Sequence, residues 1–387
     1  MSASPLCIRR ASPGGCDAWY SREWSFGVPT ATWLDREAAF RDGDSWVRGR
    51  RQLWTLSRGD EALASCETYL LSPAHAAAAA PHAHGVLHGF ASVFVNEGHR
   101  RRGHASALLR GVMEALEREH APEAAPLLGF VLFSDVGDRL YAPLGFSVWE
   151  RGGVSDWVST RLDTLLELPA LLLLEEQAPP RSLLPAAADS SAQPLRVQLP
   201  LGDTPQDALI EVELLPGAMV CPSDALADAS ALRVSPDPAL LRCWLRYGRG
   251  NRALLREGAR LLRYHTAVLP ALGGACCTFN YNWAHDIDEL CVLALSAGEP
   301  GAGGGAAATR ALLRLARGVA AAAGLARVRI WETGAISRAL EDAAAGEAEG
   351  AAWQREARDG SVPMFCPSQR YRGVISEWVD VQAGMWL

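Results

Sequence analysis

Short apolar runs recur along the first part of the chain and predict strands. Residues 53–57 and 62–72 have strand-like patterns, and residues 88–95 (HGFASVFV) and 127–133 (LLGFVLF) are continuous apolar runs of strand length. A continuous run is typical of a strand that is buried on both faces of its sheet. The low-complexity insert PAHAAAAAPHAH, which follows the second run, predicts a surface loop.

Two other stretches have helical spacing. Residues 31–42 (ATWLDREAAFRD) predict one helix, and a second is predicted from Ala105 onward. The apolar positions of the second form the i, i+3, i+4, i+7 stripe of an amphipathic helix, namely Ala105, Leu108, Leu109, Val112, Met113 and Leu116. Alternating strands and helices predict a mixed α/β (α+β) fold with a central sheet flanked by helices.

The second half of the chain repeats this order of elements. A buried strand (ELCVLAL), a glycine-rich loop, a helix closed by Gly324 and a further strand (ARVRIWE) follow one another. We therefore predict a degenerate internal duplication, based on the order of elements and not on sequence identity. Residues 161–205 are rich in Pro, Ala, Leu and Ser and predict a linker between an N-terminal domain (1–160) and a C-terminal domain (206–387).

Composition excludes some classes of protein. Of the 387 residues, 49% are hydrophobic and 21% charged, which is typical of a packed globular protein. The net charge of −7 argues against a nucleic-acid-binding protein, because such proteins usually present a basic face. All 37 basic residues are arginine. Biased codon use explains this, and an enzyme that modifies lysine while carrying none of its own is the alternative.

The cysteines and the apolar runs bear on location. Nine cysteines occur without a CxxC pair, which fits a reducing compartment better than a disulfide framework. The N-terminal residues lack the apolar core of a signal peptide, and the most apolar run, LLELPALLLLEE, is too short to span a bilayer. We therefore expect a cytoplasmic protein that does not contact membranes.

Positive charge and glycine are concentrated where a predicted strand passes into a predicted helix. In VNEGHRRRGHASALL, residues 95–109, Arg100, Arg101 and Arg102 precede Gly103. The first turn of a helix offers unpaired N–H groups and the positive end of the helix dipole, so it binds anions. Gly103 allows close approach of the backbone and arginine can form bidentate bonds to phosphate. The pattern predicts a pyrophosphate site, and a solvated charge run is the alternative.

Two other phosphate-binding motifs are excluded at this loop. The chain has no GK[ST] here, so it is not a Walker-type loop, and the spacing of Gly98 and Gly103 does not fit the dinucleotide fingerprint. The frame V-x-x-x-x-R-x-x-G-x-A followed by S-A-L-L instead resembles the acetyl-CoA loop of the GNAT superfamily of N-acetyltransferases.

A second motif strengthens this resemblance. SDVGDRLYAPLGF, which follows the strand at 127–133, is similar to the GNAT pattern N-x-x-A-x-x-x-Y-x-x-x-G-F. Tyr141, Gly145 and Phe146 match the pattern, whereas Ser134 and Gly137 replace its Asn and Ala. Together the two motifs and their surroundings cover most of residues 31–150.

A narrower resemblance is carried by TWLDREAAF, ASCETYL, the S-D-x-G before Tyr141, the two-domain length and the EWVDVQAGMW terminus. These segments resemble the fungal lysine N6-acetyltransferases of lysine catabolism, in which the carboxyl half is described as a second GNAT-like domain. This resemblance implies a catalytic GNAT domain followed by a diverged GNAT-like domain.

The resemblance also implies a reaction and its residues. Acetyl-CoA is the expected co-substrate, and an amine, most specifically the Nε of free L-lysine, attacks its thioester directly in a ternary complex. Tyr141 is the expected general acid, and Glu67 is the expected general base, acting directly or through water. Glu67 and Asp135 are also expected to bind the amine. A packed helix tyrosine and a surface glutamate are the alternatives for these residues. The expected cofactor-binding residues are Phe94, Val95, Arg100, Arg101, Arg102, Gly103, His104, Ala105, Ser106 and Ser134.

Other readings remain open. The acceptor could be a polyamine, another small amine or a protein lysine, and a non-catalytic acyl-CoA-binding protein is the alternative from a different class. The string His82, His84 and His88 mimics metal-ligand spacing, but we expect no metal site. In FNYNWAHDIDEL, aromatic and acidic side chains could bind the amino end of an amino acid, or form a surface loop: Tyr281, Trp283, Asp286, Asp288 and Glu289.

Overall fold

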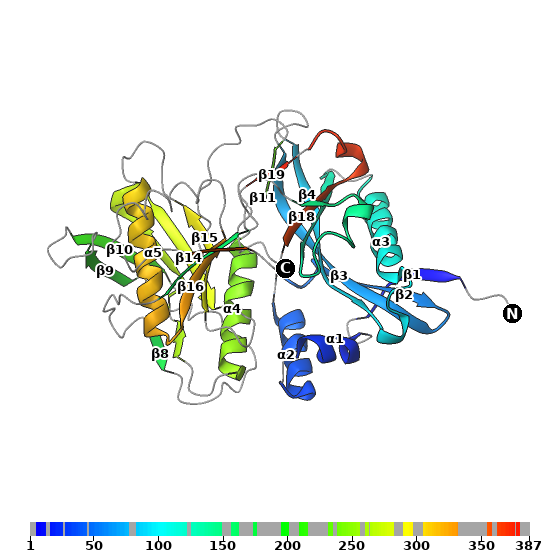
Figure 1. The fold of residues 1–387 in the computed structure, drawn as a ribbon, viewed down its shortest axis with the longest axis horizontal. Coiled ribbons are helices and arrows are strands. Elements are labelled where there is room, and N and C mark those ends of the chain that lie inside the picture. Colours follow the sequence, from blue (N-terminus) through cyan, green and yellow to red (C-terminus); the bar gives the residue numbers. More distant parts are fainter. Residues whose placement is uncertain are drawn as a thin grey trace.

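The computed structural model contains two large sheets and a small ribbon, with helices packed on the sheets (Figure 1). It describes residues 5–12, 16–25, 28–44, 46–76, 83–121, 125–148, 156–161, 173–175, 195–200, 209–215, 231–234, 238–255, 260–262, 264–281, 289–296, 305–331, 354–357, 362–375 and 377–379. The expected mixed α/β architecture with a large mixed sheet is confirmed.

The first sheet has nine strands. Along its main path lie β1 (Leu6–Arg10), β2 (Arg51–Arg58), β3 (Glu61–Ala76), β4 (Ala83–Val95), β5 (Leu127–Ser134), β18 (Val362–Pro367) and β6 (Ser147–Val148). Neighbours on this path are antiparallel except for β4 and β5, which are parallel. Two further strands, β11 (Ala231–Val234) and β19 (Glu377–Val379), attach through β3.

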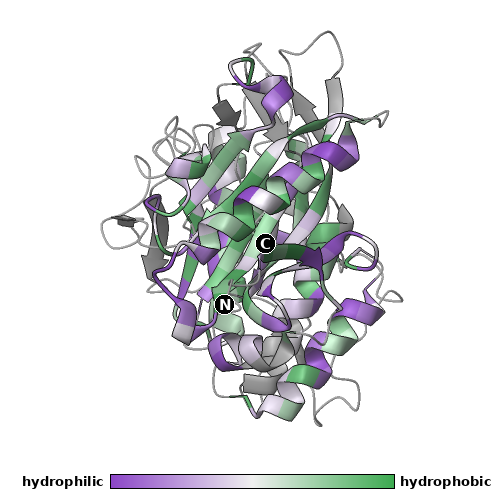
Figure 2. Cartoon of the chain, turned by 90° about the vertical axis from the view of Figure 1, so that its right-hand side faces the viewer, coloured by the Kyte–Doolittle hydropathy of each residue, from purple (hydrophilic) through white to green (hydrophobic). Residues whose placement is uncertain are grey.

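Helices cover this sheet on both faces. Successive side chains of a strand point to opposite faces, so the apolar strands of this sheet have apolar side chains to bury on each face. On one face α3 (His104–His120) buries its apolar stripe against Trp54 and Cys66. On the other, α1 (Asp17–Trp24) and α2 (Thr30–Gly43) pack near Leu53 and Phe94. Figure 2 shows strands that are largely hydrophobic beneath helices with mixed polar and apolar surfaces. The helices predicted at 31–42 and from Ala105 are confirmed.

The second sheet has eight strands. Its order is β17 (Gln354–Ala357), β7 (Asp156–Arg161), β16 (Arg327–Trp331), β15 (Glu289–Ser296), β14 (Ala275–Tyr281), β13 (Thr266–Leu269), β10 (Leu209–Leu215) and β9 (Leu195–Pro200). Its helices are α4 (Pro238–Leu255) and α5 (Gly305–Ala322), and β8 (Leu173–Glu175) pairs with β12 (Arg260–Leu262) in the ribbon. The remaining short helical turns are η2 (Glu97–His99), η3 (Ala142–Leu144), η5 (Pro270–Leu272) and η6 (Gln369–Tyr371).

The two sheets share one arrangement, which supports the predicted duplication. In each, a strand pairs in parallel with the strand that follows its helix: β4 with β5 around α3, and β15 with β16 around α5. The segments that connect strand to helix, residues 96–103 and 297–304, have the same length. Moreover, β4 and β15 each carry an extra residue in the ladder with the preceding strand.

The two halves exchange a strand at the equivalent position of each sheet. β18, from the carboxyl end of the chain, lies beside β5, whereas β7, which follows the first half, lies beside β16 (Figure 1). β18 of the C-terminal half therefore belongs to the first sheet, and β7, at the end of the N-terminal half, belongs to the second. The domain bounds 1–160, 161–205 and 206–387 stay predictions from composition. Sequence composition marks Pro- and Ala-rich segments, but strand exchange depends on pairing between residues far apart in the chain.

A shared core joins the two halves. One hydrophobic cluster contains Tyr69 and Leu87 of the first sheet together with Trp244 of α4 and Leu293 of β15. Beside it, the buried carboxylate of Asp44 pairs with Arg246 of α4 and accepts a hydrogen bond from the backbone N–H of Trp46 at 2.7 Å. The position of α2 is thus coupled to the second half.

Two expectations about connecting segments need revision. The PAHAAAAAPHAH insert is not simply a loop, because β3 continues to Ala76 and β4 starts at Ala83, with His75 paired to His84. Pairing of β11 with the end of β3 supplies backbone partners that the sequence pattern does not reveal. Within the expected linker at 161–205, the described residues include β8 and β9. Among the described residues, no helix is long and apolar enough to cross a membrane.

Candidate functional site

A bulge and a gap interrupt the first sheet at the carboxyl end of β4. Ser65 pairs with Phe94 and Glu67 with Ala91, so Cys66 faces two residues of β4, and Ser92 adopts a positive φ of 51°. Such a bulge turns backbone groups out of the ladder. The parallel ladder between β4 and β5 ends at Phe90, although both strands continue beyond it. The final residues of β4 therefore present backbone groups along an open side.

The loop that follows this open strand leads directly into α3. Gly103 is the N-cap residue of α3 and has a φ of 77°, and Arg101 also has a positive φ of 60°. A Cβ added at Gly103 would meet no protein atom within 4 Å. The backbone N–H groups of His104, Ala105 and Ser106 lie in the first helical turn, where no intrahelical acceptor exists. The loop therefore has open space beside Gly103 and unpaired N–H groups, which suit an anion.

The side chain of Arg100 is held by contacts within the protein. Its Nε donates to the carbonyl oxygen of Val95 at 3.2 Å, and its Nη2 pairs with Glu23 of α1 at 2.8 Å. Its guanidinium also lies 5.5 Å from the ring centroid of Phe94, which packs against Trp19. Arg100 thus fastens the loop to β4 and α1. Arg101 and Arg102 are exposed at the turn.

His104 begins α3 as a buried residue. Burial first, and then the nearby guanidinium of Arg58, lowers the pKa of His104 below its ordinary value. The imidazole therefore favours its neutral form, in which it does not repel the other cations of the loop. Its ring lies 6.1 Å from that of His99, whose Nε2 is 2.9 Å from the carboxylate of Glu61.

Tyr141 lies beside the gap, at the turn after β5. Its ring packs edge-on against Phe146 with centroids 6.0 Å apart, within the core formed with α3. Burial, followed by the charges of Asp135 and Cys66, raises the pKa of Tyr141 to about 12. Phe146 in turn packs edge-on against Phe90, the residue at which the β4–β5 ladder ends, with ring centroids 6.3 Å apart, so Tyr141 lies near the start of the gap.

Ser134 and Asp135 occupy the turn between β5 and Tyr141. The hydroxyl of Ser134 donates to the carbonyl of Gly137 at 2.6 Å and accepts from the N–H of Val136 at 3.2 Å. Ser134 is buried and its hydroxyl shapes the turn, while Asp135 is exposed. Gly137 has a φ of 73°, which explains a glycine where the GNAT pattern has Ala.

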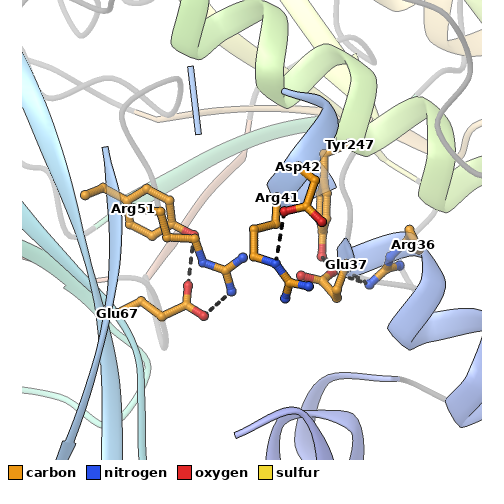
Figure 3. Close-up of polar contacts among 8 residues, drawn as sticks. Arg36, Glu37, Arg41, Asp42, Arg51, Glu67 and Tyr247 are labelled. Carbon is orange, nitrogen blue, oxygen red and sulfur yellow. Dashed lines mark hydrogen bonds and ion pairs between the residues drawn. The ribbon is translucent and has the colours of Figure 1, made fainter. Parts of the chain in front are cut away.

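Glu67 is a buried partner of other charged and polar groups. It pairs with Arg51 of β2 and accepts a hydrogen bond from the hydroxyl of Tyr69 at 2.8 Å (Figure 3). Burial, and then the charge of Glu67, raises the pKa of Tyr69 well above its ordinary value, and Tyr20 responds in the same way. Glu67 is therefore not a surface glutamate, which was the alternative considered for it.

The sheet separates the two predicted catalytic residues. Glu67 extends from β3 to the face covered by α1 and α2, since it shares that face with Leu53 and Ala91. Cys66 and Tyr141 belong to the opposite, α3-covered core. The gap between β4 and β5 is thus the route by which groups on the two faces could act on one molecule. Asp135 follows β5, and its charge contributes to the raised pKa of Tyr141.

Sequence reasoning missed two features of this site. Ser92 has no glycine or proline signal to mark its positive φ, since the bulge arises from the register between β3 and β4. Arg51 and Tyr69 belong to the Glu67 group through the pairing of β2 with β3. The register, and hence the group, is set by long-range pairing.

The other candidate clusters are structural where they are described. His88 is buried and its Nε2 lies 2.9 Å from that of His120 at the end of α3. The hydroxyl of Tyr281 accepts from the N–H of Leu262 at 2.6 Å, and Glu289 is buried in ion pairs with two arginines, Arg327 and Arg329. Four further candidates, His82, Trp283, Asp286 and Asp288, lie outside the described residues.

Comparison with known proteins gives similarity at the level of solved structures. No family model matches the chain, and no curated protein sequence matches it. The chain is similar to a GCN5-related N-acetyltransferase from Kribbella flavida, with 16% identity over 94% of this chain and 71% of that chain and a TM-score of 0.47.

Two smaller proteins match part of the chain. A GNAT-family N-acetyltransferase from Escherichia coli, solved in complex with CoA, has 18% identity, covers 38% of this chain and 72% of its own, and gives a TM-score of 0.27. NAA60 from Arabidopsis thaliana, solved with acetyl-CoA, has 15% identity, covers 42% and 92%, and gives a TM-score of 0.27. These identities and TM-scores are too low to assign a family or a substrate, which must be argued from the chain's own residues.

Proposed function

We propose that this protein is an acetyl-CoA-dependent N-acetyltransferase of the GNAT type. The observation that carries the proposal is one continuous feature: a bulged strand, β4, that separates from its parallel neighbour and runs through an R-x-x-G-x-A loop into the first turn of α3. The open strand suits an extended amide-containing chain, and the loop suits a pyrophosphate. CoA carries both groups in one molecule.

The residues present fit this co-substrate. The open space beside Gly103 would admit a phosphate, and N–H groups of residues 101–106 would bind it. Amides of the pantetheine arm would pair with the last residues of β4, including Phe94 and Val95. Arg100 contributes indirectly, since it holds the loop against β4 and α1. Ser134 contributes by shaping the turn that presents Tyr141.

The reaction is direct transfer of the acetyl group. The lone pair of a neutral amine attacks the thioester carbonyl carbon, a C–N bond forms, and the C–S bond breaks to release the thiolate of CoA. A backbone N–H at the β4 bulge stabilises the oxygen as it becomes negatively charged. The amine gives up its proton, and the thiolate is stabilised by a hydrogen bond from Tyr141 before it is protonated.

Glu67 would act in this scheme through its charge and through water. Its carboxylate is already paired with Arg51 and Tyr69, so both of its oxygen atoms are held in place. We therefore assign to Glu67 the orientation of the incoming amine and of the water that removes its proton. This is the water-mediated version of the base role expected from the sequence.

The proposed acceptor is the Nε of free L-lysine. The support is the lysine acetyltransferase-like segments TWLDREAAF, which forms α2, and ASCETYL, which contains Glu67. Both segments line the α2 face of the site, where an acceptor would approach. In this arrangement the N-terminal half is catalytic, and the second half, through α4, shapes the acceptor site.

A thiol-release assay tests the proposal. Purified protein, acetyl-CoA and a panel containing L-lysine, spermidine, a lysine-containing peptide and no amine are compared by the rate of free CoA formation. We expect L-lysine to accelerate release over the amine-free rate. Acceleration by spermidine or the peptide alone would exclude free L-lysine as the acceptor but keep the proposed acetyl-transfer reaction. Binding of acetyl-CoA without acceleration by any amine would exclude the proposed enzymatic activity.

A further inference from the structure

A group of charged side chains lies between the first sheet and helices α2 and α4 (Figure 3). Arg36 of α2 donates from Nη2 to Glu37 at 3.0 Å and lies within 3.3 Å of the hydroxyl of Tyr247 on α4. Tyr247 also donates to Glu37 at 3.3 Å. Arg41, one helical turn further, pairs with Asp42 at 3.5 Å. This part of the group joins the two halves.

Arg51 completes the group from the side of the sheet, and it has an unused donor. Its Nη2 pairs with Glu67, whereas its Nη1 is buried and has no hydrogen-bond partner among the described residues. Burial acts to lower the pKa of Arg51, but the carboxylate of Glu67 and then Tyr69 outweigh it, so the pKa is raised and the guanidinium is charged. A buried, charged donor without a partner is unfavourable, and a bound ligand atom would relieve it.

Arg51 belongs to a group that we call the arginine cluster, which consists of Arg36, Arg41 and Arg51 together with the carboxylates of Glu37 and Glu67. Within this cluster, Nη1 of Arg51 is the donor that a carboxylate of a bound molecule would satisfy. Arginine binds carboxylates with planar, two-point geometry, which suits the free Nη1.

The cluster is close to the expected point of acetyl transfer. Glu67 is paired with Ala91, the residue before the bulge at Ser92, and it holds the guanidinium of Arg51. Arg51 lies on β2, two strands from β4, which is about 10 Å at a strand spacing of about 4.8 Å, and its guanidinium contacts Glu67 on the intervening strand β3. This is the scale of a small molecule, so both ends of one amino acid would reach. The side chain of Arg51 as a whole is 12% exposed, whereas its Nη1 atom is buried.

We propose that Arg51 binds a carboxylate of the acceptor, and that the acceptor is therefore an amino acid and not a polyamine. This inference rests on the proposed acetyl transfer and adds the residue that selects the acceptor. The amine points toward the β4 bulge, and the carboxylate lies against Nη1 of Arg51.

Three acceptors that share the same side-chain amine test the inference in the wild-type protein. L-lysine carries the carboxylate, L-lysinamide replaces it with a neutral amide, and cadaverine lacks it. We expect kcat/KM for L-lysine to exceed that for either analogue by about 10–150-fold, the range for a hydrogen-bonded pair of charged groups. Equal values for the three acceptors, or faster reaction of cadaverine, would overturn the proposal without any substitution in the protein.

Variants then test the residue. Arg51→Gln should raise KM for L-lysine, while KM for acetyl-CoA stays unchanged. The ratio of kcat/KM for L-lysine to kcat/KM for cadaverine should fall to within about twofold of one. Arg48→Gln is the matched control: it removes a charge from an exposed side chain whose hydrogen bond, among the described residues, is to the carbonyl oxygen of Asp42 at 2.6 Å, and it should keep the wild-type ratio. A ratio unchanged in Arg51→Gln would exclude Arg51 as the selecting residue.

Because Arg51→Gln also deprives Glu67 of its ion pair, Arg51→Lys is measured beside it. Lysine keeps the positive charge but not the two-point geometry, so an intermediate ratio is expected, and a full wild-type ratio would contradict the role of Nη1. If no amine accelerates thiol release, the proposed function itself fails. If amines react but their carboxylates have no effect, only this inference fails.

Discussion

The variant Tyr141→Phe, which removes only the phenolic oxygen, tests the assignment of Tyr141 as the residue that stabilises the departing thiolate. The ring of Tyr141 is buried and packed edge-on against Phe146, so phenylalanine should fill the same space with little change in the free energy of unfolding. What is lost is the hydroxyl, which is the group proposed to contact the departing thiolate.

The magnitude follows from the pKa. That of Tyr141 is about 12. A thiol such as that of CoA has a pKa near 8.5, so complete transfer of the tyrosine proton to the thiolate would be uphill by about 3.5 pKa units, or about 5 kcal/mol. Tyr141 therefore donates a hydrogen bond instead of giving up its proton. A hydrogen bond to a charged group contributes about 1.5–3 kcal/mol, so kcat should fall by about 10–150-fold.

The assay is steady-state thiol release with the affinity for acetyl-CoA measured separately by calorimetry. We expect the loss in kcat with the acetyl-CoA Kd changed by less than about threefold. Tyr371→Phe is the control, since Tyr371 is equally buried but lies at the turn after β18, and its kcat should be unaltered. If Tyr141→Phe keeps the wild-type kcat, Tyr141 only packs the core and the reasoning is refuted.

Three further predictions concern the loop, the pH dependence and the strand exchange. Gly103→Ala should weaken acetyl-CoA binding at least ~10-fold in calorimetry. The control Gly324→Ala has a similar φ of 69° and open space at its Cβ, so it should have the same backbone strain of about 1–2 kcal/mol but bind acetyl-CoA normally. Equal affinities of the two variants for acetyl-CoA would refute the loop assignment. Burial, and then His120 and Arg10, lower the pKa of His88 to about 3 in the folded protein. Below pH 6.5 the unfolded chain therefore binds a proton at His88 that the folded protein does not bind. The free energy of unfolding consequently falls as the pH drops from about 6.5 toward 3. Between pH 7.5 and 5 this loss is about 2 kcal/mol in urea titrations, and His88→Gln should lose correspondingly less; an identical loss in the variant would contradict the assignment. A fragment of residues 1–160 should aggregate or remain unfolded by circular dichroism and gel filtration, because β5 would lose its partner β18, and a soluble folded monomer would argue against a structural need for the exchange.

The sequence predicted the elements whose signals are local. The stripe from Ala105 to Leu116 and the apolar runs at 88–95 and 127–133 depend on neighbouring residues only, and they correspond to α3, β4 and β5. The position of Gly103 at a strand-to-helix turn was likewise visible, since a glycine before an amphipathic stripe is a local pattern.

Features that depend on distant residues were not predictable. The placement of β18 beside β5 requires contact between residues more than two hundred positions apart, for which periodicity contains no information. The bulge at Ser92 depends on how β3 and β4 align, and the neighbours of Glu67 depend on how β2 and β3 align. A one-residue shift of either register would move these side chains to the other face.

Arg100 illustrates the same limit within a motif. The sequence places it in the R-x-x-G-x-A frame but does not show that its side chain is occupied by Val95 and Glu23. Conversely, Arg51 belongs to no motif, yet the fold brings it to Glu67 with a free donor. Sequence motifs indicate where the candidate site lies, whereas the contacts in the fold indicate what each side chain does there.

The most direct test of the central claim is mass spectrometry of the small-molecule products after incubation of the purified protein with acetyl-CoA and L-lysine. The chain contains no lysine, so acetylation of its own side-chain amines cannot consume the donor. We predict stoichiometric appearance of free CoA and of lysine carrying one acetyl group on Nε. Unmodified lysine and intact acetyl-CoA, in the presence of protein shown to bind acetyl-CoA, would contradict the account.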